Sequence, residues 1–314
     1  MIVMLAIMAG CAGGGSSSSA PGAGLGSPTA SAPEASASEF PLSVVDDEGT
    51  AVELADRPER IVSLTPGTTE ILFAIGAGDR VVATTDADDY PPEAVPLPDV
   101  GSFAAVDVER IVELEADLVF AGGNQFTPPD AIARLRDLEI PVIVIYASTV
   151  DGVAVDVELV GSAVGNQAEA ATVADRMRDE IAAIGEALAD APRPRVFYEI
   201  DASAGLFGPA EDSFLAEMIE LAGGEAITTG SAESFEMDLE RLVAADPEII
   251  VLGDAAFGAT PEQVAERPAW DQMTAVRIGA IRVADDKLIT RPGPRLPLGL
   301  RSLALAIHPD ARLP

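Results

Sequence analysis

The chain has 314 residues, of which 48% are hydrophobic and 4% aromatic, and its formal net charge is −33. This length and apolar content can form two domains with a core in each. The charge argues against nucleic acids and anionic membrane surfaces as partners, because both require a basic protein face. Such acidity keeps a protein soluble, and with Lys287 as the one lysine it also suits a salty habitat or a GC-rich genome.

The first segment, residues 1–11, reads M-I-V-M-L-A-I-M-A-G-C and ends in the single cysteine, Cys11. It resembles a bacterial lipobox, which implies cleavage before Cys11 and a lipid on that residue. A free cysteine in a short apolar segment is the alternative. The segment is too short for a transmembrane helix. We therefore expect an extracytoplasmic protein that is held to the cell membrane by lipid.

The next segment, residues 12–39, consists almost entirely of Gly, Ser, Ala, Pro and Thr. It has too few large apolar side chains to offset the entropy of ordering, so it predicts a disordered tether. As a flexible coil it would reach roughly 30 Å.

Residues 40–150 alternate short apolar strands with amphipathic helices, a pattern typical of a parallel sheet covered by helices on both faces. Thr65 and Pro66 provide an N-cap and a first-turn proline for the first helix. The predicted strands are 61–64, 81–84, 118–121 and 142–146, and the predicted helices are 67–75, 108–114 and 129–138.

Residues 151–191 lack such strands and predict linking helices. One long helix is expected over about 167–190, after a shorter helix that breaks near Gly165. The alternation resumes in residues 192–314, with predicted strands 196–199 and 249–252 and predicted helices 214–221 and 239–244. The fold class predicted is α/β, with two Rossmann-like lobes joined by one long helix and a ligand cleft between them.

A short acidic phrase occurs once in each predicted lobe. Residues 107–118 read D-V-E-R-I-V-E-L-E-A-D-L, and residues 238–249 read D-L-E-R-L-V-A-A-D-P-E-I. Each copy lies on a short helix just before a strand, which indicates that the two lobes are related. The alternative is ordinary helix capping, because Asp107 and Asp238 are good N-caps and an acid in the first turn suits the helix dipole.

Five motifs in order resemble the substrate-binding proteins of ABC importers for vitamin B12, ferric siderophores and haem, with the vitamin B12 binders nearest. The motifs are R-I-V-S-L-T-P-G-T-T-E-I-L-F-A-I-G at 60–76, D-D-Y-P-P-E at 88–93, V-G-S-F at 100–103, D-V-E-R-I-V-E-L-E-A-D-L-V at 107–119 and R-P-G-P-R at 291–295. The resemblance implies a ligand held between two lobes on a rigid helix. It also implies that Glu109 and Glu240 dock onto an ABC permease dimer, which works with a cytoplasmic ATPase. The protein itself is expected to be a monomer.

Ligands of α/β sheets bind beyond the carboxyl ends of the strands. That rule selects the loops that follow the predicted strands in each lobe. The candidate contacts there are Thr65, Pro66, Tyr90, Asn124, Gln125, Asp201, Phe207 and Asp254.

The resemblance adds Gly101 and implies that Tyr90 and Phe103 supply aromatic contacts. Tyr90 has an alternative role, packing beside the prolines that follow it. Arg291 and Arg295 flank a Pro-Gly-Pro turn, where they either hold an anionic group or balance the acidic surface.

An enzymatic role finds little support. His308 is the one histidine and precedes a proline near the C-terminus, so we expect it at a helix end. A Ser-His-Asp triad would have to use it, and a catalytic zinc site usually needs two or three histidines or cysteines.

The sequence therefore predicts a binding protein with no intrinsic cofactor, whose ligand is a cobalt corrinoid or a ferric chelate. Vitamin B12 leads, and a ferric siderophore or haem is the alternative, as is a ligand-sensing surface lipoprotein without an importer.

Overall fold

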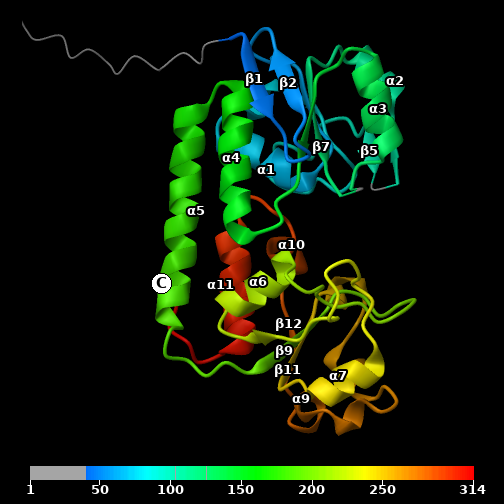
Figure 1. Cartoon of the computed structure of the whole chain (residues 1–314), viewed down its shortest axis with the longest axis vertical. Coiled ribbons are helices and arrows are strands. Elements are labelled where there is room, and N and C mark those ends of the chain that lie inside the picture. Colours follow the sequence, from blue (N-terminus) through cyan, green and yellow to red (C-terminus); the bar gives the residue numbers. More distant parts are fainter. Residues whose placement is uncertain (1–39, 103, 125) are drawn as a thin grey trace, which may run out of the picture. The chain divides into compact units, whose positions relative to one another are not determined.

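The computed structural model describes residues 40–102, 104–124 and 126–314, and it contains two four-stranded parallel sheets (Figure 1). Buried apolar runs form the central strands of both sheets. The first sheet has the order β4-β3-β7-β8, from β3 (Ile61–Ser63), β4 (Val81–Ala83), β7 (Leu118–Gly122) and β8 (Val142–Ile145). The second has the order β10-β9-β11-β12, from β9 (Arg195–Glu199), β10 (Glu225–Ala226), β11 (Ile249–Leu252) and β12 (Ile281–Val283).

The two sheets share one topology. In each, the first strand along the chain lies between the second and the third, and the fourth follows at the edge. The helix after each first strand also ends alike, with Gly76 at φ +78° and Gly223 at φ +81°. This equivalence supports the relation between the lobes that the repeated acidic phrase indicated.

Helices cover the sheets as the α/β pattern predicted. In the first lobe α1 begins at the Thr65 N-cap, whose side chain accepts a hydrogen bond from the Thr68 N–H. The helices of this lobe are α1 (Pro66–Ala74), α2 (Val108–Glu113) and α3 (Pro129–Asp137). Those of the second are α6 (Phe214–Leu221), α7 (Leu239–Ala245), α8 (Pro261–Ala265), α9 (Thr274–Arg277), α10 (Asp286–Ile289) and α11 (Leu296–Ile307).

Several short elements were not predicted. None of the missed strands is buried along its whole length, as β3 and β8 are, so they lack the continuous apolar run by which the other strands were recognised. They include the antiparallel hairpin of β1 (Leu42–Val45) and β2 (Ala51–Leu54), the pair of β5 (Gly101–Ser102) and β6 (Ala105–Val106), and β10 and β12. The 3₁₀ turns η1 (Gly78–Arg80), η2 (Asp254–Phe257) and η3 (Trp270–Gln272) were missed as well.

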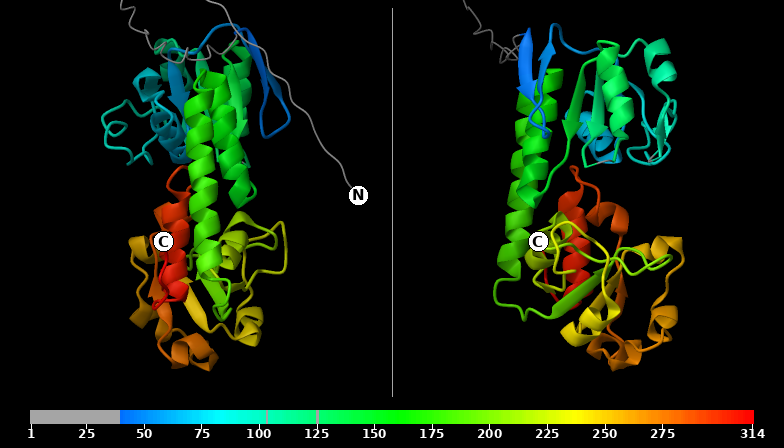
Figure 2. Two further views of the ribbon diagram at one scale, coloured as in Figure 1. Left: turned by 90° about the vertical axis from the view of Figure 1, so that its left-hand side faces the viewer. Right: turned by 45° about the vertical axis from the view of Figure 1, so that its right-hand side comes forward.

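Two helices join the lobes. α4 (Val150–Val164) ends at Gly165 in the left-handed conformation, and α5 (Gln167–Ala187) follows for 21 residues, about 31 Å. α5 packs along α4 and also contacts α6 and α11 of the second lobe (Figure 2). The two helices approach closely because Gly161 faces Ala170, whose Cβ lies 2.1 Å from where a Cβ on Gly161 would be.

One apolar core runs continuously from the first sheet through α4 and α5 to the second sheet and α11. Its members include Ile61, Val157, Met177, Tyr198 and Leu300, all of them buried. Moving one lobe relative to the other would expose part of this core, so α5 acts as a stiff link.

Within the part of the chain that the structure describes, no helix is long and apolar enough to span a membrane.

Candidate functional site

Three loops of the first lobe meet where its strands end. Thr65 and Pro66, which follow β3, line a small cavity together with Thr85 from the loop after β4 and Phe126 from the loop after β7. Ser102, next to the predicted contact Gly101, lies in the same lining. The cavity holds about 90 Å³, whereas small-molecule sites hold about 300–1,000 Å³. It can therefore take only one group of a large ligand.

Phe126, which lines this cavity, forms an aromatic pair with Tyr146. The rings of Phe126 and Tyr146 lie 6.3 Å apart, and Asn124 Nδ2 donates to the Tyr146 hydroxyl at 3.0 Å. Both rings keep exposed surface, 50% for Phe126 and 38% for Tyr146. Gly123 lets the loop pass here, because a Cβ on it would come within 2.8 Å of Tyr146 Cβ. Sequence reasoning missed Tyr146, although it directly follows β8 and the strand-end rule would have selected it.

The second lobe presents its own strand-end loops. Phe207 is half-buried, and its backbone N–H donates to the carbonyl of Asp201 at 2.8 Å, which closes the loop after β9. Asp254 follows β11 and is 7% exposed, and burial raises the pKa of its carboxyl group. Phe257, which ends the same predicted loop, is 90% exposed. These residues offer apolar and acidic surface, with no cation in the described loops after β9 and β11.

Ion pairs connect the loops of the two lobes. Asp89, from the first lobe, accepts hydrogen bonds from Lys287 and from Arg291 Nη1, the latter at 2.5 Å. Partial burial would raise the pKa of Asp89, but the bonds from Arg291 and Lys287 outweigh it and lower that pKa to about 2. The carboxylate therefore stays ionised and paired at neutral pH.

Arg295 also forms an ion pair with a carboxylate of the first lobe. Its Nε and Nη2 donate to the two carboxylate oxygens of Glu70 at 2.8 and 2.5 Å, and Glu70 is 3% exposed. The guanidinium carbon lies 4.0 Å from the ring centroid of Tyr90. The sequence left open whether Arg291 and Arg295 bind an anionic group, and in the structure each pairs with a carboxylate of the first lobe.

Four predicted features lie outside the described residues. They are the aromatic contact Phe103, the neighbouring contact Gln125, the lipid-bearing Cys11 and the tether 12–39.

The 292–294 turn sits directly on the start of α1. A Cβ on Gly67 would lie 2.3 Å from the carbonyl oxygen of Pro292, which is backbone and cannot move aside cheaply. Gly185 in α5 has nothing within 4 Å of such a Cβ.

We therefore expect Gly67→Ala to destabilise the protein by about 1–3 kcal/mol through overpacking. Gly185→Ala should instead stabilise it by about 0.5–1 kcal/mol, since alanine is the better helix former. Urea denaturation measures both values. Equal effects of the two substitutions would show that the turn does not press on α1.

The paired acidic helices have the expected geometry. Asp107 and Asp238 are the N-caps, and their side chains accept hydrogen bonds from the N–H groups of Arg110 and Glu240 at 2.9 and 2.8 Å. Glu109 and Glu240 lie in the first turn of these helices, and both residues are exposed. The aspartates cap the helices, so the glutamate side chains are not needed for capping. The Glu109 side chain is 83% exposed and lies 3.6 Å from Arg134.

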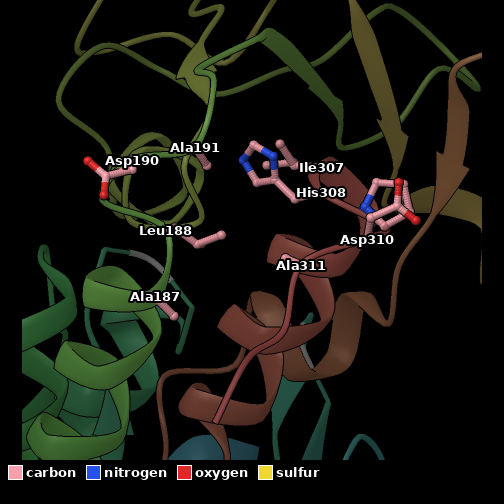
Figure 3. Close-up of a pocket in the computed structure, with 9 residues that line it drawn as sticks. Ala187, Leu188, Asp190, Ala191, Ile307, His308, Asp310 and Ala311 are labelled. Carbon is pink, nitrogen blue, oxygen red and sulfur yellow. The ribbon is translucent and has the colours of Figure 1, made fainter.

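A larger cavity of about 440 Å³ lies where α5 and α11 end (Figure 3). His308 lines it, caps α11 as predicted and contacts the Gly223 carbonyl at 3.1 Å. Residues 187–191, which also line it, lead into β9 and so lie at the amino edge of the second sheet. Ligands of such sheets bind at the opposite edge, so this cavity is not the candidate site. No group of three metal-ligating side chains occurs among the described residues.

The family comparison fits this geometry. The family model described as "Periplasmic binding protein" matches residues 61–288. The chain belongs to the periplasmic binding protein family. Membership implies a small-molecule ligand and an ABC permease partner, an extracytoplasmic location, and binding rather than catalysis.

The relatives of this periplasmic binding protein bind different ligands. It is 31% identical over 276 residues to the uncharacterised ABC transporter substrate-binding lipoprotein YvrC of Bacillus subtilis, covering 86% of this chain and 87% of that one. It is 32% identical over 283 residues to a cobalamin-binding protein of Halobacterium salinarum, covering 87% and 75%. The haem-binding protein RhuT of Roseiflexus aligns with a TM-score of 0.71 at 26% identity, covering 81% and 99%. Similarity therefore establishes solute binding and leaves the ligand to the site's chemistry.

Proposed function

We propose that this protein is a lipid-anchored receptor that captures a cobalamin-like ligand between its two lobes and delivers it to an ABC permease. Thr65 and Pro66, with the rings of Tyr90, Phe126 and Tyr146, form the first-lobe wall of the site. Asp201, Phe207, Asp254 and Phe257 form the second-lobe wall. Gly101, Phe103, Asn124 and Gln125 complete the proposed contacts.

The ion pairs at the site favour a ligand without net charge. In the described parts of the strand-end loops, in α10 and in the 291–295 turn, the cations are Lys287, Arg291 and Arg295. Each has a carboxylate partner, Asp89 for Lys287 and Arg291 and Glu70 for Arg295, so an anionic group of the ligand would have to compete with one of these pairs. Haem carries two propionates and ferric catecholates are polyanions, whereas cyanocobalamin has no net charge. A neutral ligand avoids an unpaired buried anion, which is costly.

The anchor and the transport step rest on other support. A lipid on Cys11 agrees with the sequence of residues 1–11 and with the lipoprotein relative. One acidic helix per lobe, at equivalent positions of the same topology, suits a permease dimer that is driven by a cytoplasmic ATPase. Monomeric action follows from the two lobes of one chain completing the site.

Calorimetric titration of the purified full chain with cyanocobalamin, haem and ferric siderophores tests the ligand. We expect binding heat with cyanocobalamin and a negative heat capacity change, because aromatic surface is buried. Heat with haem or an anionic siderophore, together with none for cyanocobalamin, would overturn this proposal in favour of an iron-chelate receptor.

A further inference from the structure

Tyr90 rests on a guanidinium group that a buried carboxylate holds. The three side chains come from distant segments: Glu70 lies on α1, Tyr90 follows β4, and Arg295 is the N-cap of α11. The edge of the Arg295 guanidinium is bound bidentately by Glu70, while its face lies 4.0 Å from the ring centroid of Tyr90. The hydrogen-bonding edge of the guanidinium and one of its faces therefore both contact other residues of the protein.

The backbone around Arg295 is held as firmly as its side chain. Gly293 lies against Gly67 of α1, since a Cβ on Gly293 would lie 3.2 Å from the Gly67 carbonyl oxygen. The neighbouring Arg291 bonds Asp89, the residue just before Tyr90. The turn therefore fixes the arginine, and through it the segment that carries the ring.

The second lobe contains the same arrangement with a different outcome. Arg267 binds Glu199 at 2.5 and 2.9 Å and lies 4.6 Å from the ring centroid of Trp270. Trp270 is 4% exposed and belongs to the core, whereas Tyr90 is 41% exposed. In the first lobe the stacked ring thus keeps one surface open to solvent or to a ligand.

We propose that Arg295 is a positioning residue that holds the Tyr90 ring in its ligand-contacting orientation, and that Glu70 in turn holds Arg295. The inference rests on the proposed function, in which Tyr90 contacts the ligand. A ring that is stacked before binding loses less conformational freedom when the ligand arrives. Arg295 thereby contributes to affinity without touching the ligand.

The first test needs no ligand. The chain has three tyrosines, so 3-fluorotyrosine labelling yields three fluorine NMR signals, and Tyr90→Phe identifies the one from Tyr90. We expect Arg295→Gln to shift or broaden the Tyr90 signal. The matched control Arg267→Gln removes the same kind of pair from beneath a buried ring and should leave that signal in place. An unmoved Tyr90 signal in Arg295→Gln would refute the positioning role.

The second test measures coupling in binding. Arg295→Gln should weaken cyanocobalamin binding by about 3- to 30-fold, the range of a partly desolvated cation–π contact. In a Tyr90→Ala background the same change should have no further effect. A loss of equal size in both backgrounds would mean that Arg295 acts on the ligand directly. If Arg295→Gln does not fold because Glu70 then keeps only its 3.8 Å ion pair with Arg291, Glu70→Gln/Arg295→Gln removes that buried charge and answers the same question.

The two proposals fail separately. Absence of cyanocobalamin binding by the wild-type protein would reject the proposed ligand, while the fluorine signals would still decide whether Arg295 positions Tyr90.

Discussion

Charge reversal of both Glu109 and Glu240 to lysine is expected to reduce ligand uptake by a factor of about ten or more, because charge pairs at an interface set docking rate and register. Ligand affinity should not change. Both glutamates lie on short helices, α2 and α7, with their side chains exposed. The measurement is uptake of labelled cobalamin by cells carrying the variant, with calorimetry on the purified protein beside it.

The matched control reverses Glu169 and Glu186, which are exposed on α5 and change the net charge by the same amount. Uptake should then remain near the wild-type level. Full uptake by the Glu109→Lys/Glu240→Lys protein would contradict docking at these helices. It would favour a ligand sensor that works without an importer.

Asp156→Asn is expected to stabilise the protein at pH 8 by up to about 5 kcal/mol, the linkage free energy of a pKa raised from near 4 to about 8, and to leave it little changed at pH 4. Asp156 lies on α4 and is 3% exposed, and its Oδ2 has no hydrogen-bond partner among the described residues. Burial, together with the charge and hydrogen bond of Asp47, raises the pKa of Asp156 to about 8. The folded state therefore prefers the protonated acid.

The direction of the pH effect follows from that preference. Below the unfolded pKa near 4 the carboxyl group is protonated in both states and imposes no penalty. As the pH rises from about 4 to 8, the unfolded chain gains by ionising while the folded protein does not, so the free energy of unfolding falls. Above pH 8 the penalty is constant.

The free energy of unfolding is measured for wild type and variant across pH 4–9. The difference between the two at each pH gives the contribution of Asp156, because the other carboxylates contribute equally to both proteins. Asp175→Asn, on the exposed face of α5, should give a flat difference. A flat difference for Asp156→Asn as well would show that Asp156 is ionised in the folded protein.

Local features of the chain were readable from the sequence because they depend on neighbouring residues. Ile249–Leu252 is a strand and Phe214–Leu221 a helix with the predicted bounds. The predicted end of the long helix was about 190, and α5 ends at Ala187, because a helix end depends on the last turn's packing as well as on the following prolines. The repeated acidic phrase correctly indicated two lobes of one topology.

Only the tertiary structure decided which side chains meet across the chain. Glu70 and Arg295 are 225 residues apart, and nothing near either one indicates that they pair beneath Tyr90. Without that pairing, Arg291 and Arg295 were candidates for anion binding. Local sequence determines strands, helices and caps through short-range backbone and side-chain preferences. The partner of a charged or aromatic group depends on how the two sheets and the α5 link pack, and that packing determines which charges remain for the ligand.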